Sequence, residues 1–328
     1  MSPSVAVVGA GAWGKNHVRA FHELGALGGV VETSPGLRQR LRLDFPGVPV
    51  WSCLEMAFDQ VEGLVIATPA PSHAALAARA LAAGLGVLVE KPMTLDTAMA
   101  ETLVSLAETS GKPLMVGHLL LYQPAIQELK RQLELGLVGR VLRVHQHRLN
   151  LGQVRATENV LWSLAPHDVA VLLYLLDGPP ETVSATGAAF LQPGITDDVH
   201  LELTFAGGRS AHIHACWYWP EKRRGLRVMG ESGMVVYDEE DQSLVLQRRH
   251  LKGGPGPEGL GSVDRGPVRL FRGEGQALLR EAQHFLACLA SGAKPLSDGR
   301  SGVEVIRVLE AAEACLTKTP LEYAKESR

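Results

Sequence analysis

The sequence of 328 residues predicts an α/β protein whose first part is a doubly wound, parallel sheet. Two observations support this fold class. Short apolar segments alternate with helix-like segments up to about residue 118, and the apolar segments lack regular polar positions, as in strands that helices bury on both faces. A glycine-rich turn also follows the first apolar segment directly, where sheets of this kind bind phosphate groups.

Apolar and β-branched runs define the expected strands of this sheet, and glycines mark the ends of the helices between them. The first helix-like segment ends at Gly25, the second at Gly84 and the third at Gly111. Ser72 is the expected N-cap of the second helix. The expected strands are Val5–Val8, Gly29–Glu32, Gly63–Thr68, Val87–Val89 and Leu114–Val116, and the expected helices are Trp13–Leu24, Ser72–Ala83 and Asp96–Ser110.

Gly9, Gly11 and Gly14 form a G-x-G-x-x-G pattern between the first strand and the first helix. In this context the first glycine permits a tight turn, the second lets the backbone approach a pyrophosphate, and the third lets helix and strand pack closely. The N–H groups at the helix N-terminus then face the phosphates, and Ala12 and Trp13 lie in the same turn. The pattern predicts a dinucleotide-binding domain; the alternative is a glycine turn that holds no ligand.

Glu32 ends the second strand and predicts which dinucleotide binds. A carboxylate at this position can accept hydrogen bonds from the adenosine ribose hydroxyls and would repel a 2′-phosphate. We therefore expect NAD, with NADP less favoured. Arg38 or Arg40 could instead serve the 2′-phosphate of NADP, but we expect both side chains to face solvent on a helix.

Composition and charge exclude several classes of protein. Hydrophobic residues make up 46% of the chain and charged residues 20%, as in folded soluble proteins. The net charge of −3, without a basic tail or an acidic run, gives no reason to expect nucleic acid or a membrane surface as partner. The N-terminus lacks a positively charged flank and a cleavage site, and no apolar run is long enough to span a membrane, so we expect a cytoplasmic protein.

No metal site is expected from the sequence. The four cysteines lie far apart without a C-x-x-C pair, which argues against disulfides and against structural zinc. Two pairs of histidines, His145 with His147 and His212 with His214, each share one face of an expected strand. Zinc could use such pairs, but a sheet surface or a subunit interface explains them better. The cysteines are Cys53, Cys216, Cys288 and Cys315.

Glu90-Lys91-Pro92 directly follows the strand Val87–Val89. A dinucleotide-binding domain with this tripeptide resembles the glucose–fructose oxidoreductase, inositol dehydrogenase and rhizopine catabolism (Gfo/Idh/MocA) family, and in particular its branch acting on nucleotide-linked sugars or their uronates. The resemblance covers nearly the whole chain. Further motifs that carry it are Ala67-Thr68-Pro69 with His73, Val116-Gly117-His118, Tyr122-Gln123-Pro124-Ala125, Leu164-Ala165-Pro166-His167-Asp168, Trp217 with Pro220-Glu221-Lys222, and Pro295-Leu296-Ser297-Asp298-Gly299.

The resemblance implies a Rossmann domain over residues 1–118 and a substrate-binding α+β domain over residues 119–328 with a large, open, mostly antiparallel sheet. The exposed face of that sheet is implied to join subunits into a homodimer or homotetramer. Period-two alternation in the second half agrees with such a sheet. The expected strands are Val141–Leu149, Thr182–Ala188, His200–Phe205, Ser210–Trp217 and Arg227–Met229. Two amphipathic helices follow, with stripes at Leu279, Ala282, Leu286 and Leu289 and at Val303, Ile306, Leu309 and Leu316.

Oxidation of a secondary alcohol needs a general base beside the hydroxyl while hydride passes to the nicotinamide. The resemblance implies this role for Lys91, with Glu90 near the nicotinamide and Pro92 in a cis peptide. Burial beside a cationic nicotinamide would bring the pKa of Lys91 toward neutrality. His167 is the second expected catalytic residue, because imidazole transfers protons at neutral pH. The alternatives are a solvated lysine at a strand end and a histidine satisfied by local hydrogen bonds at a helix start.

Ser163 departs from the family pattern. Members commonly have an aspartate four residues before the histidine, beside the lysine, and a hydroxyl cannot supply that negative charge to His167. We expect Ser163 to be an N-cap that bonds the N–H of Ala165, with Pro166 in the first turn of the helix. Asp168 should point to another face than His167.

The substrate pocket is the least defined part of the expected site. Tyr122, Trp162 and Lys222 could stack on a sugar or pair with a phosphate or carboxylate, beside Lys91, Ser163 and His167, but they fit ordinary packing or surface positions equally. Thr68, Pro69 and His73 are expected near the cofactor. The stretch Gly253–Gly261 is expected to be a loop.

The leading interpretation is an NAD-dependent dehydrogenase of a sugar, nucleotide-sugar or cyclitol. Two alternatives remain open. One is an enzyme that keeps NAD tightly bound and uses transient oxidation for elimination or hydrolysis. The other is a non-catalytic NAD-binding regulator of the same fold, which the missing aspartate favours and the intact Glu90-Lys91-Pro92 and His167 oppose.

Overall fold

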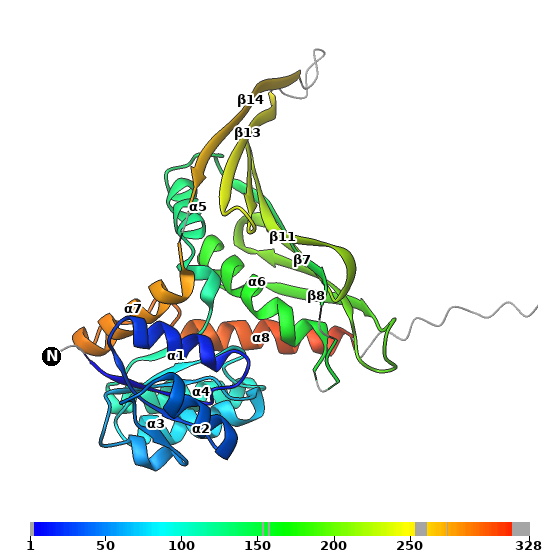
Figure 1. Cartoon of the computed structure of the whole chain (residues 1–328). Helices are drawn as coiled ribbons and strands as arrows, with labels where there is room; N and C mark the ends of the chain where they lie inside the picture. Colours follow the sequence, from blue (N-terminus) through cyan, green and yellow to red (C-terminus); the bar gives the residue numbers. More distant parts are fainter. Residues whose placement is uncertain (1–2, 153, 157, 253–260, 274, 317–328) are drawn as a thin grey trace, which may run out of the picture. The chain divides into compact units, whose positions relative to one another are not determined.

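The computed structural model describes residues 3–152, 154–156, 158–252, 261–273 and 275–316 (Figure 1). The chain divides into two compact units. The first unit comprises Met1–Gln127 and Glu274–Arg307, and the second comprises Glu128–Gly273 and Val308–Arg328. The sequence predicts a boundary at residue 118, with every later residue in the second domain. In the structure residues 119–127 and 274–307 belong to the first unit instead.

Six parallel strands form the sheet of the first unit, in the order β3-β2-β1-β4-β5-β6. The connection from β1 to β2 runs toward one edge and the connection from β4 to β5 toward the other, so right-handed crossovers place their helices on opposite faces. This is the doubly wound sheet that the sequence predicts. The strands are β1 (Val5–Val8), β2 (Leu27–Val31), β3 (Val50–Trp51), β4 (Gly63–Ile66), β5 (Gly86–Val89) and β6 (Leu114–Val116).

The helices of the first unit begin and end close to the expected positions, and α2 is the helix expected to carry Arg38 and Arg40, whereas β3 was not expected. Ser72 precedes α3, but its side chain caps no N–H group, since its Oγ donates to the carbonyl oxygen of Pro69 at 2.7 Å. The helices are α1 (Gly14–Glu23), α2 (Pro35–Asp44), α3 (His73–Ala82), α4 (Thr97–Ser110) and α7 (Ala277–Ser291), with 3₁₀ turns η1 (Leu54–Ala57), η2 (Ala70–Ser72) and η3 (Leu119–Tyr122).

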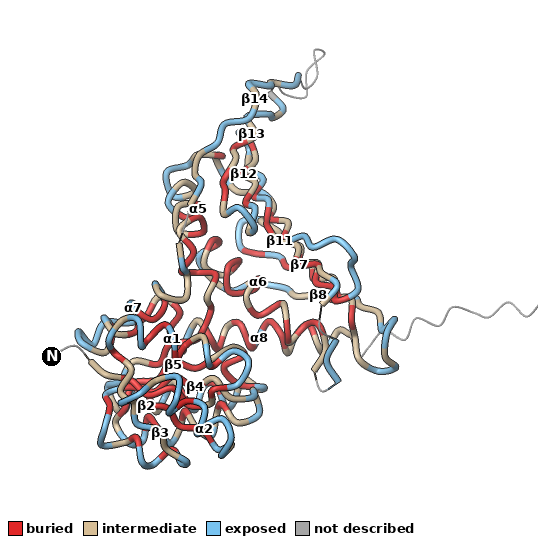
Figure 2. The backbone as a smooth tube through the Cα atoms, viewed as in Figure 1, coloured by how far each residue is buried: buried red, intermediate tan, exposed pale blue. Residues whose placement is uncertain are grey.

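The core of the first unit lies around β1, β4 and β5, whose residues are all buried (Figure 2). Helix α7 approaches this sheet over two glycines. A Cβ atom on Gly63 or Gly86 would come within 2.9 Å or 2.3 Å of the side chain of Leu289. The missing side chains therefore let α7 pack directly on β4 and β5, which explains why this late segment joins the first unit.

Eight strands form the sheet of the second unit, in the order β14-β13-β12-β11-β7-β10-β9-β8. Only β7 and β10 pair in parallel, so the sheet is mostly antiparallel, as the resemblance implies. Of the expected loop Gly253–Gly261, residues 253–260 lie outside the described residues. The strands are β7 (Val141–Leu151), β8 (Thr182–Ala188), β9 (Asp198–Phe205), β10 (Arg209–Cys216), β11 (Tyr218–Gly230), β12 (Gly233–Asp238), β13 (Ser243–Lys252) and β14 (Gly261–Arg272).

Helix α6 (Val160–Leu176) covers one face of this sheet by packing on β7, β9 and β10 (Figure 1). Alternate residues of these strands are buried beneath it, and the residues between them form the opposite face. Helices α5 (Pro124–Glu134) and α8 (Gly299–Leu316) contain two of the three boundaries between the units, and the third follows Gly273. The 3₁₀ turn η4 (Ala206–Gly208) joins β9 to β10.

A buried ion cluster joins α6 to the sheet. Asp168 is fully buried and accepts hydrogen bonds from Arg148 Nε at 2.9 Å and from Gln146 Nε2 at 2.7 Å. The other side of the Arg148 guanidinium donates to Glu239 at 2.9 Å. Burial alone would lower the pKa of Arg148, but the charges of Asp168 and Glu239 outweigh it and raise that pKa. Arg148 therefore stays charged between two carboxylates.

Within the described part of the chain, no helix combines the length and the apolar character that crossing a membrane requires.

Candidate active site

The glycine turn connects β1 to α1 with the geometry that a phosphate cradle needs. Gly9 has φ +85°, a conformation that favours glycine, and its N–H donates to the carbonyl oxygen of Val31 at 2.8 Å. A Cβ atom on Gly14 would lie 2.0 Å from the carbonyl oxygen of Gly9, so only glycine fits there. A Cβ atom on Gly11 would meet no atom within 4 Å. The space beside Gly11 is therefore open to a ligand.

A cavity of about 480 Å³ lies next to this turn, at the carboxyl ends of β1, β2 and β4. Ligands of open α/β sheets bind at this edge. Apolar side chains of Leu37, Leu54 and Leu76 also line the cavity, as a flat adenine base would require. Five of the residues expected from sequence to bind the cofactor line it as well, namely Gly9, Gly11, Glu32, Thr68 and Pro69.

The Glu32 carboxylate is oriented by backbone groups before any ligand binds. Its Oε2 accepts a hydrogen bond from the N–H of Ala10 at 2.9 Å, and its Oε1 accepts one from the N–H of Ser34 at 2.9 Å. Each carboxylate oxygen keeps a further lone pair, so both can still accept hydrogen bonds from ribose hydroxyls. The residues of this cavity thus fit the adenosine half of NAD.

The two arginines that follow Glu32 are already engaged. Arg38 Nη1 donates to the carbonyl oxygens of Glu32 at 2.9 Å and Thr33 at 2.6 Å. Arg40 lies on α2 with an exposed side chain that pairs with Asp44 at 3.5 Å. The sequence predicts that Arg38 faces solvent. In the structure its side chain instead bonds the backbone at the end of β2 and stabilises it.

Glu90 and Lys91 follow β5 at the same edge of the sheet. The Glu90 carboxylate accepts a hydrogen bond from the indole N–H of Trp13 and contacts Nε2 of His17 at 2.6 Å. Its other oxygen accepts the backbone N–H of Lys91 at 3.2 Å. The peptide between Lys91 and Pro92 is cis, as the resemblance implies. The turn that carries Lys91 is therefore tied to the glycine turn through Glu90 and Trp13.

Electrostatics around Lys91 favour a charged carboxylate and a neutral imidazole. Burial alone would raise the pKa of Glu90, but the hydrogen bond and charge of His17 and the charge of Lys91 leave that pKa below its ordinary value. His118 is buried nearby, and burial together with the charge of Lys91 lowers its pKa to about 4. Sequence reasoning assigned no role to His17 or His118. The spacing of His17 four residues after Trp13 could have placed both on one helix face.

His73 lies behind these turns. Its side chain is buried; Nδ1 contacts the carbonyl oxygen of Pro92 and Nε2 that of Thr68, both at 2.8 Å. Both ring nitrogens are thus used by the backbone, and the residue holds the segment after β4 beside the segment after β5. His73 was expected near the cofactor; its contacts make it a positioning residue for Thr68 and Pro92.

Glu281 on α7 is a site residue that the sequence analysis missed. It is fully buried, and burial together with the negative charge of Glu90 raises its pKa well above the ordinary value. Its Oε1 has no hydrogen-bond partner among the described residues. The expected stripe of α7 passed through Leu279 and Leu286, whereas the most buried positions include Glu281 and Phe285. The carboxyl group of Glu281, on the buried face of α7, is the sequence feature that could have indicated a site residue.

We expect Glu281 to make the stability of the first unit fall as pH rises. Above about pH 4.3 the unfolded chain releases this proton, but the folded chain retains it up to the raised pKa, so folding loses free energy over that interval. Glu281→Gln removes this term. The melting temperature of the variant minus that of the wild type should therefore increase from pH 5 to pH 8 in thermal scans. Equal pH dependence of the two proteins would refute the assignment. Glu101→Gln, at an exposed carboxylate, is the control and should track the wild type.

In the second unit, Ser163 does not cap a helix, and that expectation was wrong. Helix α6 begins at Val160, and the cap is Asn159, whose side-chain oxygen accepts the N–H of Trp162 at 3.2 Å. Ser163 is buried inside the helix, where its hydroxyl oxygen accepts the indole N–H of Trp217 at 3.0 Å. Pro166 lies within the helix and not in its first turn. The Asn159 cap adds a turn before the position where proline suggested the start.

His167 therefore lies in the second turn of α6 and not at its start. Its side chain is half-buried, whereas Asp168 is fully buried against Arg148. The two side chains point to different faces, as expected from helix geometry. The ion cluster holds Asp168 against Arg148, and the position one turn before His167, where family members commonly have an aspartate, is Ser163.

The three further substrate residues differ in their surroundings. Tyr122 is buried in the first unit, where its hydroxyl bonds Ser297 Oγ at 2.9 Å and burial raises its pKa. Trp162 donates its indole N–H to Glu313 at 3.2 Å. Lys222 is exposed on β11 and pairs with Glu240 at 2.9 Å. Tyr122 thus has the contacts of a packing residue, and Lys222 those of a surface residue.

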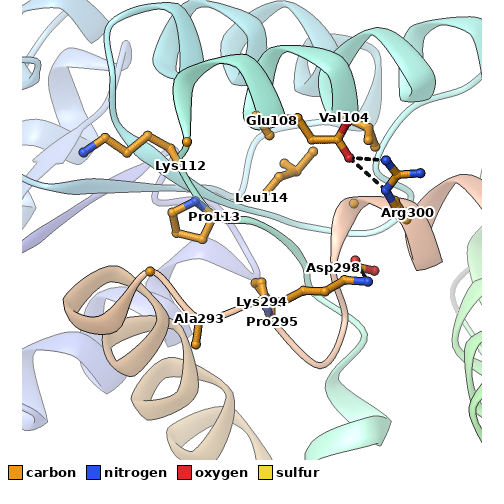
Figure 3. Close-up of a pocket in the computed structure, with 14 residues that line it drawn as sticks. Val104, Glu108, Lys112, Pro113, Leu114, Ala293, Lys294, Pro295, Asp298 and Arg300 are labelled. Atoms are coloured by element: carbon orange, nitrogen blue, oxygen red, sulfur yellow. Dashed lines mark hydrogen bonds and ion pairs between the residues drawn. The ribbon is translucent and has the colours of Figure 1, made fainter.

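A second cavity of about 370 Å³ lies in the first unit beside the amino end of β6 (Figure 3). Glu108 and Arg300 form an ion pair at its rim, and Lys294 pairs with Asp298 at 2.7 Å. This edge of the sheet is opposite to the carboxyl ends of the strands, where ligands of such sheets bind. We therefore do not assign this cavity to the active site.

Comparisons with known proteins agree with this geometry. Residues 4–118 match the family model described as "Oxidoreductase family, NAD-binding Rossmann fold", and residues 126–236 match the "GFO/IDH/MocA C-terminal domain". The UDP-N-acetylglucosamine 3-dehydrogenase of Acidithiobacillus ferrooxidans is 29% identical over 95% of this chain and 98% of its own. An inositol 2-dehydrogenase of Corynebacterium glutamicum is 31% identical over an alignment that covers 70% of this chain and 74% of that enzyme. A solved structure of the Acidithiobacillus enzyme superposes with a TM-score of 0.85 at 24% identity, covering 96% of this chain and 98% of that one.

Proposed function

The chain belongs to the Gfo/Idh/MocA oxidoreductase family, and from this we propose that it oxidises a secondary hydroxyl of a sugar, a nucleotide-sugar or a cyclitol. Family membership makes it an NAD-binding oxidoreductase. The substrate class is our proposal. The relatives that act on UDP-N-acetylglucosamine and on inositol support it, because both substrates carry ring hydroxyls on secondary carbons.

The observation that carries this proposal is the turn Glu90-Lys91-Pro92. It follows β5 at the ligand-binding edge of the sheet, and Trp13 and His17 hold Glu90 through the hydrogen bonds described above. This arrangement couples the position of Lys91 to the glycine turn, where the pyrophosphate would lie. A structural turn would not need a largely covered, charged carboxylate between the two.

When bound, NAD accepts the hydride that leaves the carbinol carbon. The chain has to remove the hydroxyl proton, and we assign this to Lys91 together with His167. Glu32 would hold the adenosine ribose, and Gly11 and the N-terminus of α1 would hold the phosphates. We propose that Ser163, bonded to the indole of Trp217, replaces the usual aspartate by fixing the wall of the pocket beside His167.

The proposal is tested by a screen for NADH formation. The purified chain is supplied with NAD and with UDP-sugars, UDP-sugar uronates, free sugars and inositols in turn. We expect NADH to accumulate with one or more members of these classes, in proportion to the ketone formed. If substrate were consumed by elimination or hydrolysis without net NADH, the tightly bound NAD alternative would replace ours. If the cofactor bound but no substrate reacted, the non-catalytic regulator would replace the dehydrogenase as the interpretation.

Glu32 is expected to set the preference for NAD. Glu32→Gln removes the charge that repels a 2′-phosphate while its amide oxygen can still accept the N–H of Ala10. Hydrogen bonds to charged groups contribute about 1.5–3 kcal/mol, so the ratio of kcat/KM for NAD over NADP should fall by about 10- to 100-fold. Glu55→Gln is the matched control, since Glu55 also lines the cavity but pairs with Arg79. An unchanged ratio in Glu32→Gln, or an equal fall in the control, would contradict the assignment.

We also propose that two or four copies associate through the face of the eight-stranded sheet opposite α6. That face carries side chains of both charges together with exposed Met229. Sedimentation equilibrium of the purified chain would check the number of copies.

A further inference from the structure

Five of the twelve histidines lie on one face of the second unit. They come from three adjacent strands and occupy the face opposite α6, where side chains are partly exposed. Register places them in two neighbouring rows across the sheet. The first row contains His147, His214 and His200, and the second contains His145 and His212 beside Glu202.

Three groups in and next to the first row lie close together. Asp198 lies two residues before His200 on β9, so both side chains share the face. His200 Nε2 lies 3.2 Å from one oxygen of the Asp198 carboxylate, and His214 Nε2 lies 3.2 Å from the other. The two imidazoles stack with ring centres 4.0 Å apart and planes 19° apart, so one ring has to turn before both Nε2 lone pairs can point at one ion. The ligating atoms of all three residues lie within 4.8 Å of one another.

We propose that Asp198, His200 and His214 bind a divalent first-row transition ion, with zinc as the foremost candidate. Zinc bonds imidazole nitrogen and carboxylate oxygen at about 2.0–2.1 Å, so ligands at tetrahedral angles stand about 3.3 Å apart. The two separations of 3.2 Å are close to that value, although each runs to a different oxygen of the carboxylate and also fits a hydrogen bond. Three protein ligands leave a fourth position, which water fills at a partly exposed site.

The side chains around this group suit a metal site. In a single chain His200 is half exposed and Asp198 and His214 are about one-sixth exposed, so an ion can reach them before copies associate through this face. The Cys216 thiol hydrogen-bonds the Asp198 carboxylate. A neutral donor of this kind orients a ligating carboxylate.

From the sequence alone, a sheet surface or a subunit interface explains the histidine pairs within one strand better than zinc does, so no metal is expected here. The pairing of β9 with β10 sets His200 directly opposite His214. The competing explanation is a His–Asp–His hydrogen-bonded cluster that binds no metal, and the experiment below separates the two.

The test uses the full-length chain without a histidine tag, treated with a chelator and dialysed. Calorimetric titration with zinc chloride should show one equivalent bound per chain. Replacing one ligand should weaken binding by about 10- to 100-fold or more, as in His200→Ala, His214→Ala and Asp198→Asn. His145→Ala is the matched control, since it lies on the same face but outside the group, and should bind zinc as the wild type does. Cobalt(II) should give the intense visible absorption of a tetrahedral site in the wild type and in the control.

Several outcomes would overturn the proposal. Wild-type chain that takes up no zinc would show the cluster to be a hydrogen-bonded one. Equal losses in His145→Ala and His214→Ala would show diffuse binding by the histidine face. Because each variant is checked for native melting temperature in the presence of chelator, loss of binding through unfolding is recognised, and Asp198→Asn then serves as the variant with the smallest change in shape. The result is independent of NAD and of any substrate, so it stands or fails apart from the proposed dehydrogenase activity.

Discussion

Lys91→Ala is expected to lower kcat by about 10²- to 10⁴-fold on the substrate that the screen identifies, because a positioned general base contributes on that scale. The affinity for NAD should change little, since the backbone N–H of Lys91 still bonds Glu90 and the glycine turn is intact. Steady-state kinetics together with calorimetric titration of NADH measure both quantities. A large fall in kcat at constant cofactor affinity identifies the residue with the chemical step.

The matched control is Lys112→Ala. Lys112 is an exposed lysine of the same unit and precedes β6, at the amino end of the sheet, where no ligand is expected. Its variant should keep the wild-type kcat. If Lys91→Ala retained turnover within a few-fold of the wild type, Lys91 would not be the base, and proton transfer would have to be reassigned to His167 alone.

Asp168→Ala is expected to destabilise the second unit by about 3–5 kcal/mol, because it removes one partner of a buried charge pair. Asp168 has no exposed surface and bonds Arg148 through both of its oxygens. Without it, Arg148 keeps only Glu239 for its buried charge, and Gln146 Nε2 loses the carboxylate to which it donates. Urea unfolding followed by the fluorescence of Trp217 and its neighbours would measure the loss.

An exposed ion pair provides the comparison. Arg140 and Glu231 contact at 3.1 Å with about half or more of each side chain exposed, so Glu231→Ala should cost less than about 1 kcal/mol. The prediction fails if Asp168→Ala lowers the free energy of unfolding by no more than Glu231→Ala does. Such a result would mean that water enters the cluster and screens Arg148, contrary to the burial described above.

Most of the fold could be predicted because local signals agreed with the tertiary arrangement. The apolar runs that became β1 and β6 were placed to the residue, since each is fully buried and bounded by glycine or proline. The strands β12 to β14 were not predicted. In β14 most positions are exposed, so its residues lack the alternation that marks a half-buried strand (Figure 2).

The start of α6 shows how one local signal can override another. Pro166 suggested the first turn, since proline is favoured there, and Ser163 then became the apparent cap. Asn159 forms the cap instead, and the helix continues through the proline with one hydrogen bond fewer. The apolar residues Val160 and Leu161, both fully buried, make the additional turn favourable.

The parts of the candidate site that sequence could not supply depend on contacts between distant segments. Glu281 lies about 190 residues after Glu90, and only the packing of α7 on the parallel sheet brings their charges together. The proposed zinc ligands depend likewise on the register between β9 and β10. Motif spacing identifies the cofactor turn because all its parts are local, from Gly9 to Gly14.

The measurement that tests the account most directly is the binding of NADH to Gly11→Val. The wild-type Gly11 has no atom within 4 Å of its Cβ position, so the variant should fold with the wild-type melting temperature. Its side chain would fill the space where the pyrophosphate approaches the turn. We predict saturable NADH binding to the wild type and at least a tenfold weaker affinity in the variant. A wild-type chain that bound neither NAD nor NADH, or a variant that bound as well as the wild type, would contradict the assignment of this turn.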